Sequence, residues 1–459
     1  MNTELITKID NLIEEYTEKL VADTIKLVNI KSVQGKASKL APYGEGPKKV
    51  LNAFSKMSKE AKLYTKDYKV GVISAAMEKG DVDLGIWLHG DVVPEGDGWS
   101  FDPYNAVEYK GCIIGRGATD NKGQLAAIYN LFKIFKELNV KLDYNPAIFV
   151  GSNEETGMLD VENFLKHYSP PKLSLVPDSS FPVGYGGKGG MNIRLKSNTP
   201  LTSLTFSAGQ PDSPGYARAV LKSDSIPDTL PECEIKRGKK TEISAFTPPR
   251  HGASPDPDGN MITKLSGALL DAELVDYEDR YALEFFKTVS KDIYGKCLGI
   301  DTEHEALGKL TVFSKSVDCN DGYVEISLNI RYPLGTNYEK IVENIEKSSK
   351  TVGFSVIQAN SGTTPYLLDK NNDIVKVLCK ASDEVIGDEK QPFTLSGGTY
   401  AHKLPNAYVF GTDANRPPDG FPKGRGGAHG IDEAASIDRL KRAMRIYARA
   451  LILLNDIEF

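Results

Sequence analysis

The first third of the chain carries apolar residues at helical spacing. The first stripe predicts a long amphipathic helix that continues to about Val28 and covers one face of a sheet. A second helix is predicted for residues 47–59, with Pro47 in its first turn, and a third for residues 123–138. The apolar positions of the first stripe are Leu5, Ile6, Ile9, Leu12, Ile13, Tyr16, Leu20 and Val21.

Apolar runs between and after these helices predict strands at residues 63–75, 84–88, 147–150 and 173–176. Strand and helix alternate as far as Asp178. This alternation is typical of an α/β layered domain, in which ligands bind at the carboxyl ends of the strands.

The pattern changes after Asp178. Residues 184–190 read G-Y-G-G-K-G-G, which is either a hinge leading out of the first domain or a plain turn cluster. A second boundary is predicted within residues 361–372, where Ser, Gly, Thr and Asn collect. The segment between these boundaries predicts an α+β insert, with strands at 192–195, 204–207, 235–246, 309–316 and 323–332 and helices at 261–270, 280–293 and 338–349. The chain then returns to helix, strand and helix at 374–386, 407–410 and 437–454.

Polar residues gather where the apolar runs of the first part end. His89 and Asp91 lie two positions apart at the end of the run 84–88, so both leave the strand on the same face. An isolated histidine in this position is more often a core or turn residue. Several polar residues at such ends favour a site instead, and the others are Asp120 before the helix at 123–138, Glu154 and Glu155 after 147–150, and Asp178 after 173–176.

These residue types suit metal ions. A neutral imidazole is the commonest metal ligand in proteins, and an acidic partner often fixes its tautomer, so His89-Gly90-Asp91 supplies both. A late G-G-A-H-G-I-D-E segment adds His429. Two imidazoles and three carboxylates suit two divalent ions, most naturally zinc, with manganese or cobalt as alternatives; the set is His89, Asp120, Glu155, Asp178 and His429.

Composition excludes other classes of protein. The chain has 459 residues, of which 40% are hydrophobic and 26% charged, as in an ordinary globular protein of two domains. A net charge of −6 argues against nucleic-acid binding. Five scattered cysteines predict neither disulfides nor a thiolate zinc site, and they favour a reducing compartment. The N-terminus carries charges and lacks an apolar signal, and no run suits a membrane span, so we expect a cytoplasmic protein.

Five motifs resemble those of the M20 metallopeptidases, a family with two zinc ions. They are H-G-D at 89–91, G-R-G-A-T-D-N-K-G at 115–123, N-E-E-T-G at 153–157, P-D at 177–178 and G-A-H-G at 427–430. They occur in the family's order and extend over the whole chain. The length and the closing region resemble the dipeptidase branch of PepV and the carnosinases.

The resemblance implies a role for each metal ligand. Asp120 would bridge the ions, His89 and Asp178 would complete one ligand set, and Glu155 and His429 would complete the other. Family members often have a cis peptide bond after the bridging aspartate, which here is the bond between Asp120 and Asn121.

Two acids beside these ligands have implied catalytic roles. Asp91 would accept a hydrogen bond from His89 and raise its basicity. Glu154 would act as the general base that takes a proton from the attacking water and returns it to the leaving amine. From the residues alone, Glu154 could equally be a solvated acid beside a ligand.

The insert and the segment after it supply further candidates. His251, in P-P-R-H-G-A-S-P, resembles a lid histidine of the family's dipeptidases that reaches the substrate carbonyl. Arg331, in N-I-R-Y-P, would bind the substrate's terminal carboxylate; otherwise it is a surface arginine at a strand end. The backbone amides of the S-G-G-T segment would help to bind the same carboxylate; its residues are Ser396, Gly397, Gly398 and Thr399. Many relatives have arginine where this chain has His402, which puts that anchoring in doubt.

The resemblance implies a two-domain α/β fold. Residues 1–186 and 369–459 would form a discontinuous catalytic, zinc-binding domain, and residues 187–368 an inserted, enlarged α+β lid. Because such a lid mimics a second subunit, we expect a monomer. The expected activity is hydrolysis of dipeptides with a free amino terminus. The alternatives are an N-acyl amino acid deacylase or desuccinylase, whose lids are usually smaller, and a non-catalytic metal- or peptide-binding protein.

Overall fold

The computed structural model of the chain describes residues 3–209, 215–222, 226–246, 256, 258–412, 417–422 and 424–459. The chain divides into two units. The first comprises Met1–Gly186, Leu367–Phe393 and Thr399–Phe459, and the second comprises Gly187–Tyr366 and Thr394–Gly398. The sequence predicts boundaries after residues 186 and 368. The contacts give Gly186 and Tyr366, and they assign the short segment Thr394–Gly398 to the second unit instead of the first.

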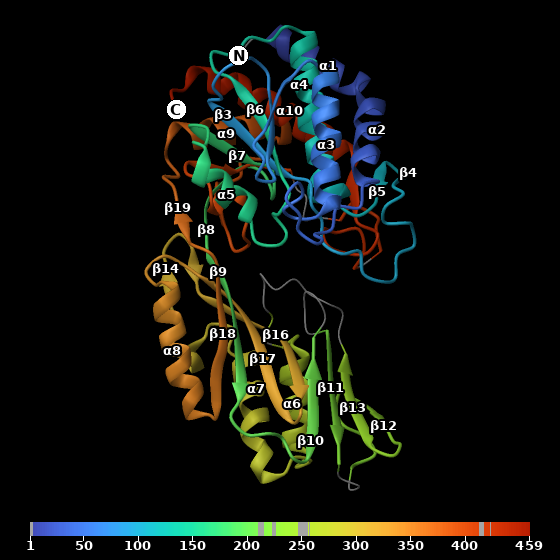
Figure 1. The fold of residues 1–459 in the computed structure, drawn as a ribbon, viewed down its shortest axis with the longest axis vertical. Coiled ribbons are helices and arrows are strands. Elements are labelled where there is room, and N and C mark those ends of the chain that lie inside the picture. Colours follow the sequence, from blue (N-terminus) through green and yellow to red (C-terminus); the bar gives the residue numbers. More distant parts are fainter. Residues whose placement is uncertain are drawn as a thin grey trace. The chain divides into compact units, whose positions relative to one another are not determined.

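The first unit is built on a nine-stranded sheet whose central strands are parallel (Figure 1). β3 pairs in parallel with β6 on one side and β7 on the other, and β7 pairs in parallel with β21. The order across the sheet is β1 (Tyr64–Asp67), β2 (Ile73–Ala76), β6 (Pro146–Gly151), β3 (Leu84–His89), β7 (Leu173–Val176), β21 (Ala407–Val409), β8 (Gly184–Gly187) and β19 (Tyr366–Leu367), with β20 (Phe393–Leu395) paired to β8.

Both faces of the central strands are covered, which explains why these strands are apolar throughout. On one face Ile86 and Leu88 of β3 belong to the main core of the unit, together with residues of the surrounding helices. On the other face Trp87 stacks on Phe149 of β6, with ring centroids 4.2 Å apart, and meets the edge of Phe164. Phe164 belongs to the helix that follows β6.

In the described part of this unit seven helices surround the sheet, as expected of an α/β domain. They are α1 (Thr3–Glu15), α2 (Thr17–Val28), α3 (Glu45–Glu60), α4 (Gly123–Glu137), α5 (Leu159–His167), α9 (Asp373–Ile386) and α10 (Ile437–Leu453). The single N-terminal helix predicted from the apolar stripe is interrupted at Tyr16. The interruption is slight, because backbone hydrogen bonds join Tyr16 to Leu12 and Leu20 to Tyr16.

A small three-stranded sheet brings two distant loops of the first unit together. It contains β4 (Val107–Tyr109), β5 (Cys112–Ile114) and β22 (Ala434–Ser436), with β5 in the middle. β22 pairs antiparallel with β5, so the loop that precedes β22 and the turn that follows β5 lie at the same end. The first loop carries His429 and the turn carries Asp120.

The second unit has the α+β character predicted for the insert. All neighbouring strands of its eight-stranded sheet are antiparallel. The order is β12 (Glu234–Lys236), β13 (Thr241–Phe246), β11 (Tyr216–Leu221), β10 (Leu204–Ala208), β16 (Thr311–Asn320), β17 (Tyr323–Tyr332), β9 (Gly189–Ser197) and β18 (Phe354–Thr363). The unit also contains α6 (Met261–Asp271), α7 (Arg280–Lys291), α8 (Tyr338–Thr351) and the hairpin of β14 (Glu303–His304) and β15 (Gly308–Lys309). Among the described residues of the whole chain, no helix has the length and apolar character needed to cross a membrane.

Candidate metal centre

The carboxyl ends of three neighbouring parallel strands supply most of the predicted ligands. β3 ends at His89, β6 leads into the loop with Glu154 and Glu155, and β7 ends two residues before Asp178. Because β3 pairs with both β6 and β7, these ends meet at one edge of the sheet. Asp120 joins them from the turn that precedes α4.

His89 is held by the backbone next to it. Its Nδ1 lies 3.0 Å from the carbonyl oxygen of Asp91 and 3.7 Å from the nearest oxygen of the Asp91 carboxylate. The predicted hydrogen bond to the carboxylate is therefore replaced by one to the carbonyl. Since Nδ1–H donates there, Nε2 is the nitrogen left for a metal ion, which would take the place of its proton; in this structure Nε2 donates to Oδ1 of Asp120 at 2.9 Å, and Asp120 holds the pKa of His89 well above its usual value.

The Asp91 carboxylate holds the next loop instead of the imidazole. Its two oxygens accept the backbone N–H groups of Glu154, at 3.2 Å, and Glu155, at 3.1 Å. Burial raises the pKa of Asp91, whereas the positive charge of His89 and these two N–H groups lower it. Asp91 therefore fixes the backbone from which both glutamate side chains extend.

Asp120 offers one carboxylate oxygen to each of the two imidazoles. Oδ1 lies 2.9 Å from Nε2 of His89, and Oδ2 lies 3.2 Å from Nε2 of His429. The same nitrogen of His429 is 3.0 Å from Glu155. This is the arrangement that a carboxylate shared between two cations requires. The peptide bond between Asp120 and Asn121 is cis, as predicted.

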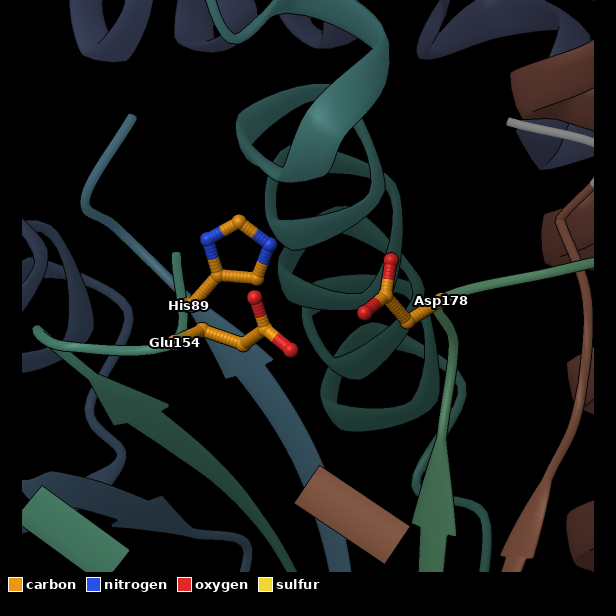
Figure 2. Close-up of side chains that lie close together, drawn as sticks. All are labelled: His89, Glu154 and Asp178. Carbon is orange, nitrogen blue, oxygen red and sulfur yellow. The ribbon is translucent and has the colours of Figure 1, made fainter. Parts of the chain in front are cut away.

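Glu154 and Asp178 form a second group with His89. Figure 2 shows the imidazole of His89 and the carboxylates of Glu154 and Asp178 pointing toward one another. In this group the ligand atoms all lie within 4.8 Å of each other, and the same holds for His89, Asp120 and Glu155. Glu154 thus lies as close to the ligand positions as Asp178 does, although the sequence assigns it no metal.

The pKa values of the buried acids indicate that added positive charge would stabilise this cluster. Burial, followed by the charge of Asp178, holds the pKa of Glu154 well above its usual value, and burial followed by the charge of Asp120 raises those of Glu155 and Asp178. Burial opposes the ionisation of Asp120 too, but hydrogen bonds with both imidazoles hold its pKa low. The crowded acids repel one another and gain from any added positive charge. The nitrogen and oxygen ligands present fit divalent metal ions.

A buried ion pair between Arg116 and Glu433, which the sequence did not predict, supports the turn that carries Asp120. The Glu433 carboxylate accepts the backbone N–H groups of Gly117, Thr119 and Asp120, at 3.1, 3.0 and 3.0 Å. It also accepts a 2.6 Å hydrogen bond from the guanidinium of Arg116. Glu433 therefore holds the turn that presents the shared aspartate.

Arg116 extends the support to the second imidazole. Its Nη2 donates to the carbonyl oxygen of His429 at 3.1 Å. His429 has a φ of 61°, a left-handed conformation that costs a non-glycine residue about 1–3 kcal/mol and needs such a partner. The side chains of Arg116 and Glu433 are each 1% exposed. The only signal in the sequence was that G-R-G stands inside one recognised motif and that I-D-E directly follows another.

The predicted substrate residues belong to other segments of the chain. His251 is outside the described residues. Arg331 ends β17 in the second unit, and its half-buried guanidinium makes no ion pair or hydrogen bond with any part of the chain that the structure describes. A Cβ on Gly190 would approach Nη1 of Arg331 to 2.4 Å, so a glycine makes room for this side chain.

The S-G-G-T segment differs from expectation at its end. The backbone N–H of Thr399 donates to Nδ1 of the buried His402 at 3.2 Å, and the Thr399 hydroxyl accepts the N–H of Ala401. The amide of Thr399 is therefore already engaged within the chain. Ser396, Gly397 and Gly398 are half-buried.

Comparisons with known proteins agree with this geometry. The sequence profile of Peptidase family M20/M25/M40 matches residues 86–453. The protein named "Putative dipeptidase YtjP", from Bacillus subtilis (strain 168), is 28% identical over an alignment 470 positions long, gaps included, which covers 95% of this chain and 96% of that protein. The crystal structure of human carnosine dipeptidase 1 is similar in fold, with a TM-score of 0.62 and 14% identity over 98% of this chain and 100% of that one. The dipeptidase Dug1p of Saccharomyces cerevisiae gives a TM-score of 0.63 and 16% identity over 99% of each chain.

Proposed function

The chain belongs to Peptidase family M20/M25/M40, and we propose from this premise that it is a metal-dependent dipeptidase acting on dipeptides with a free amino terminus. The observation that carries the proposal is the carboxylate of Asp120, with one oxygen toward each of two imidazoles. Relatives named as dipeptidases support the substrate class.

The ligands divide naturally into two sets. His89 and Asp178 would hold one ion with one oxygen of Asp120, and Glu155 and His429 would hold another with the second oxygen. We propose zinc for both, because imidazole and carboxylate suit it. When bound, such ions polarise an amide carbonyl and make a water molecule more acidic.

Glu154 is the proposed general base. Its backbone is fixed by Asp91, and its carboxylate points toward His89 and Asp178. From there it takes a proton from the attacking water and returns it to the leaving amine. A carboxylate whose pKa is raised by burial and by a neighbouring acid accepts a proton more readily than an exposed one, and this suits both steps.

Arg331 is the proposed anchor for the terminal carboxylate of the substrate. A half-buried guanidinium without an anionic partner among the described residues gains two parallel hydrogen bonds when a carboxylate arrives. His251 is proposed as a donor to the substrate carbonyl, and residues 187–366 as a lid that confines the enzyme to short substrates. We further propose that the protein is a monomer.

A substrate and metal panel tests the proposal. The purified protein is stripped with a chelator, reloaded with Zn²⁺, Mn²⁺ or Co²⁺, and assayed on dipeptides, on N-acetyl and N-succinyl amino acids and on dipeptides with an amidated carboxyl end. We expect hydrolysis of free dipeptides only after reloading, with two ions bound per chain. Faster hydrolysis of the N-acyl amino acids would contradict the substrate class, and metal binding without hydrolysis of any compound would contradict catalysis.

A further inference from the structure

The loop that follows β6 is bound through its backbone to two buried acids. Its first two N–H groups, those of Ser152 and Asn153, donate to one oxygen of the Asp160 carboxylate at 2.6 Å and 3.0 Å. The next two N–H groups donate to Asp91, as described above. Four successive backbone donors are thus fixed, although the loop has no regular secondary structure. The side chains that extend from this loop are the proposed base and one proposed ligand.

Tyr400 holds Asp160 in turn. Its phenolic hydroxyl donates to the same Asp160 oxygen at 2.6 Å, and the other oxygen accepts the N–H of Val161 at 2.8 Å. Asp160 is fully buried and Tyr400 is 1% exposed. With both oxygens engaged, the carboxylate has one orientation, and this orientation faces the loop.

The packing leaves no room for these two side chains to move apart from the loop. A Cβ on Gly151, the last residue of β6, would lie 2.0 Å from the Tyr400 hydroxyl and 2.4 Å from Asp160, so the strand approaches the pair only because it ends in glycine. The Tyr400 ring also lies edge-on to His89, with ring centroids 6.5 Å apart. Tyr400 and Asp160 therefore both lie against Gly151, and Tyr400 also lies beside the imidazole of His89.

The charge state of Asp160 also favours strong binding of the loop. Its pKa is raised to about 6, first by burial and then by the charge of Asp91, while the hydrogen bond from Tyr400 acts to lower it. Tyr400 thus favours the ionised carboxylate, which accepts N–H groups more strongly than the protonated one.

We propose that Asp160 and Tyr400 are positioning residues for catalysis, which hold the loop 152–155 so that Glu154 faces the reacting amide and Glu155 faces its ion. This inference rests on the proposed function, since it concerns the base of that reaction. Neither residue touches the substrate. Their effect is to fix the backbone, and a displacement of about 1 Å in a catalytic group costs about 100-fold in rate.

A pair of matched phenylalanine variants separates positioning from plain stability. Tyr400→Phe removes the hydroxyl that binds Asp160. Tyr16→Phe is the control, because Tyr16 is also buried and its hydroxyl also donates to a carboxylate at 2.6 Å, that of Glu137 at the C-terminal end of α4. Asp160→Asn is the stronger perturbation, and Tyr400→Phe keeps the test valid if that variant fails to fold.

We expect Tyr400→Phe to lower kcat about 10- to 100-fold at saturating metal while KM changes less than about twofold, the size typical of lost supporting contacts. Tyr16→Phe should keep both constants. Hydrogen–deuterium exchange of a peptide covering residues 151–157 should quicken in Tyr400→Phe and Asp160→Asn but not in Tyr16→Phe. A kcat for Tyr400→Phe equal to that of Tyr16→Phe, or unchanged exchange in this peptide, overturns the inference.

The exchange measurement needs no turnover. If the wild-type chain hydrolysed none of the compounds tested, the proposed function would fall, and the exchange of residues 151–157 would still decide whether Tyr400 and Asp160 fix the loop. If the wild type were active and the loop were protected equally in all variants, the proposed function would stand and the inference would be rejected.

Discussion

Replacement of Arg116 by methionine is expected to damage both the stability of the first unit and its metal affinity. Methionine fills much of the same space but leaves the Glu433 carboxylate, which is 1% exposed, without its cation. Loss of one partner from a buried ion pair costs about 3–5 kcal/mol, because the other charge stays buried and unpaired. A typical domain is stable by only about 5–15 kcal/mol, so the variant should be folded but close to its limit.

The effect on metal binding follows from the two loops that the ion pair joins. Glu433 binds the N–H of Asp120, and Arg116 binds the carbonyl of His429. Without the cation neither loop keeps its full set of contacts. Loss of supporting residues of this kind lowers metal affinity by about 10- to 100-fold.

A second arginine pair provides the control. Arg449 makes a two-pronged ion pair with Asp10, at 3.1 Å and 2.7 Å, on the outside of the same unit. Because Asp10 is partly exposed, Arg449→Met should cost only about 0–1 kcal/mol and should leave the metal affinity unchanged.

The assay uses the natural fluorescence of the chain. Its two tryptophans, Trp87 and Trp99, both belong to the first unit, so urea unfolding followed by tryptophan fluorescence reports on that unit. Unfolding is measured with chelator present, and metal affinity separately by competition with a coloured chelator. If Arg116→Met were no less stable than Arg449→Met and bound metal as tightly as the wild type, the assigned role of the ion pair would be wrong.

Three further predictions concern the base, the anchor and pH. Glu154→Ala should abolish turnover while two ions stay bound, as measured by elemental analysis beside the activity assay; equal activity would remove Glu154 from the role of base. Arg331→Lys should raise KM for free dipeptides at least about tenfold with little change in kcat, because lysine cannot form the two-pronged contact, whereas Arg194→Lys on the same sheet should change neither constant. Burial, aided at Tyr16 by Glu137, raises the pKa of Tyr16 and that of Tyr43 to about 12. Each folded pKa exceeds the unfolded value near 10, so this stability is complete below pH 10 and is lost as pH rises through 12; because solvent screens both groups, the loss is at most about 2–3 kcal/mol per tyrosine. Urea unfolding between pH 9 and 12 measures the loss, which should be smaller in Tyr16→Phe.

The local pattern of apolar residues correctly predicted those helices and strands that bury one continuous stripe or run of apolar side chains. The helix predicted at 123–138 is Gly123–Glu137, and the strand predicted at 323–332 has the same bounds in the structure. Predictions failed where the pattern is weak. The strand predicted at 235–246 is a hairpin, turning at Arg237–Lys240, and β18 was missed because, as an edge strand with mostly exposed side chains, it has no apolar alternation to recognise.

The candidate ligands could be found because each stands next to a local signal, the end of an apolar run or a glycine-flanked turn. Their supporting contacts could not. Arg116 and Glu433 are 317 residues apart in the sequence, and Tyr400 and Asp160 are 240 apart. Nothing in a short window distinguishes these acids from the surface acids that surround them. Their roles follow only from the pairing of β22 with β5 and from the position of Tyr400 against the end of β6.

The supporting acids explain how the chain tolerates so much buried negative charge. Asp91, Asp160 and Glu433 each accept at least two backbone N–H groups from the loops that carry the proposed base and ligands. Their charges are thereby stabilised by donors that the loops would otherwise have to expose to water. Burial raises the pKa values of these three acids too, but it raises those of Glu154 and Asp178, which have few donors, well above their usual values. In this fold, backbone N–H groups bind the acids that hold the loops, whereas the acids that face the site have few such donors. The missing positive charge at the site is what two dications would supply.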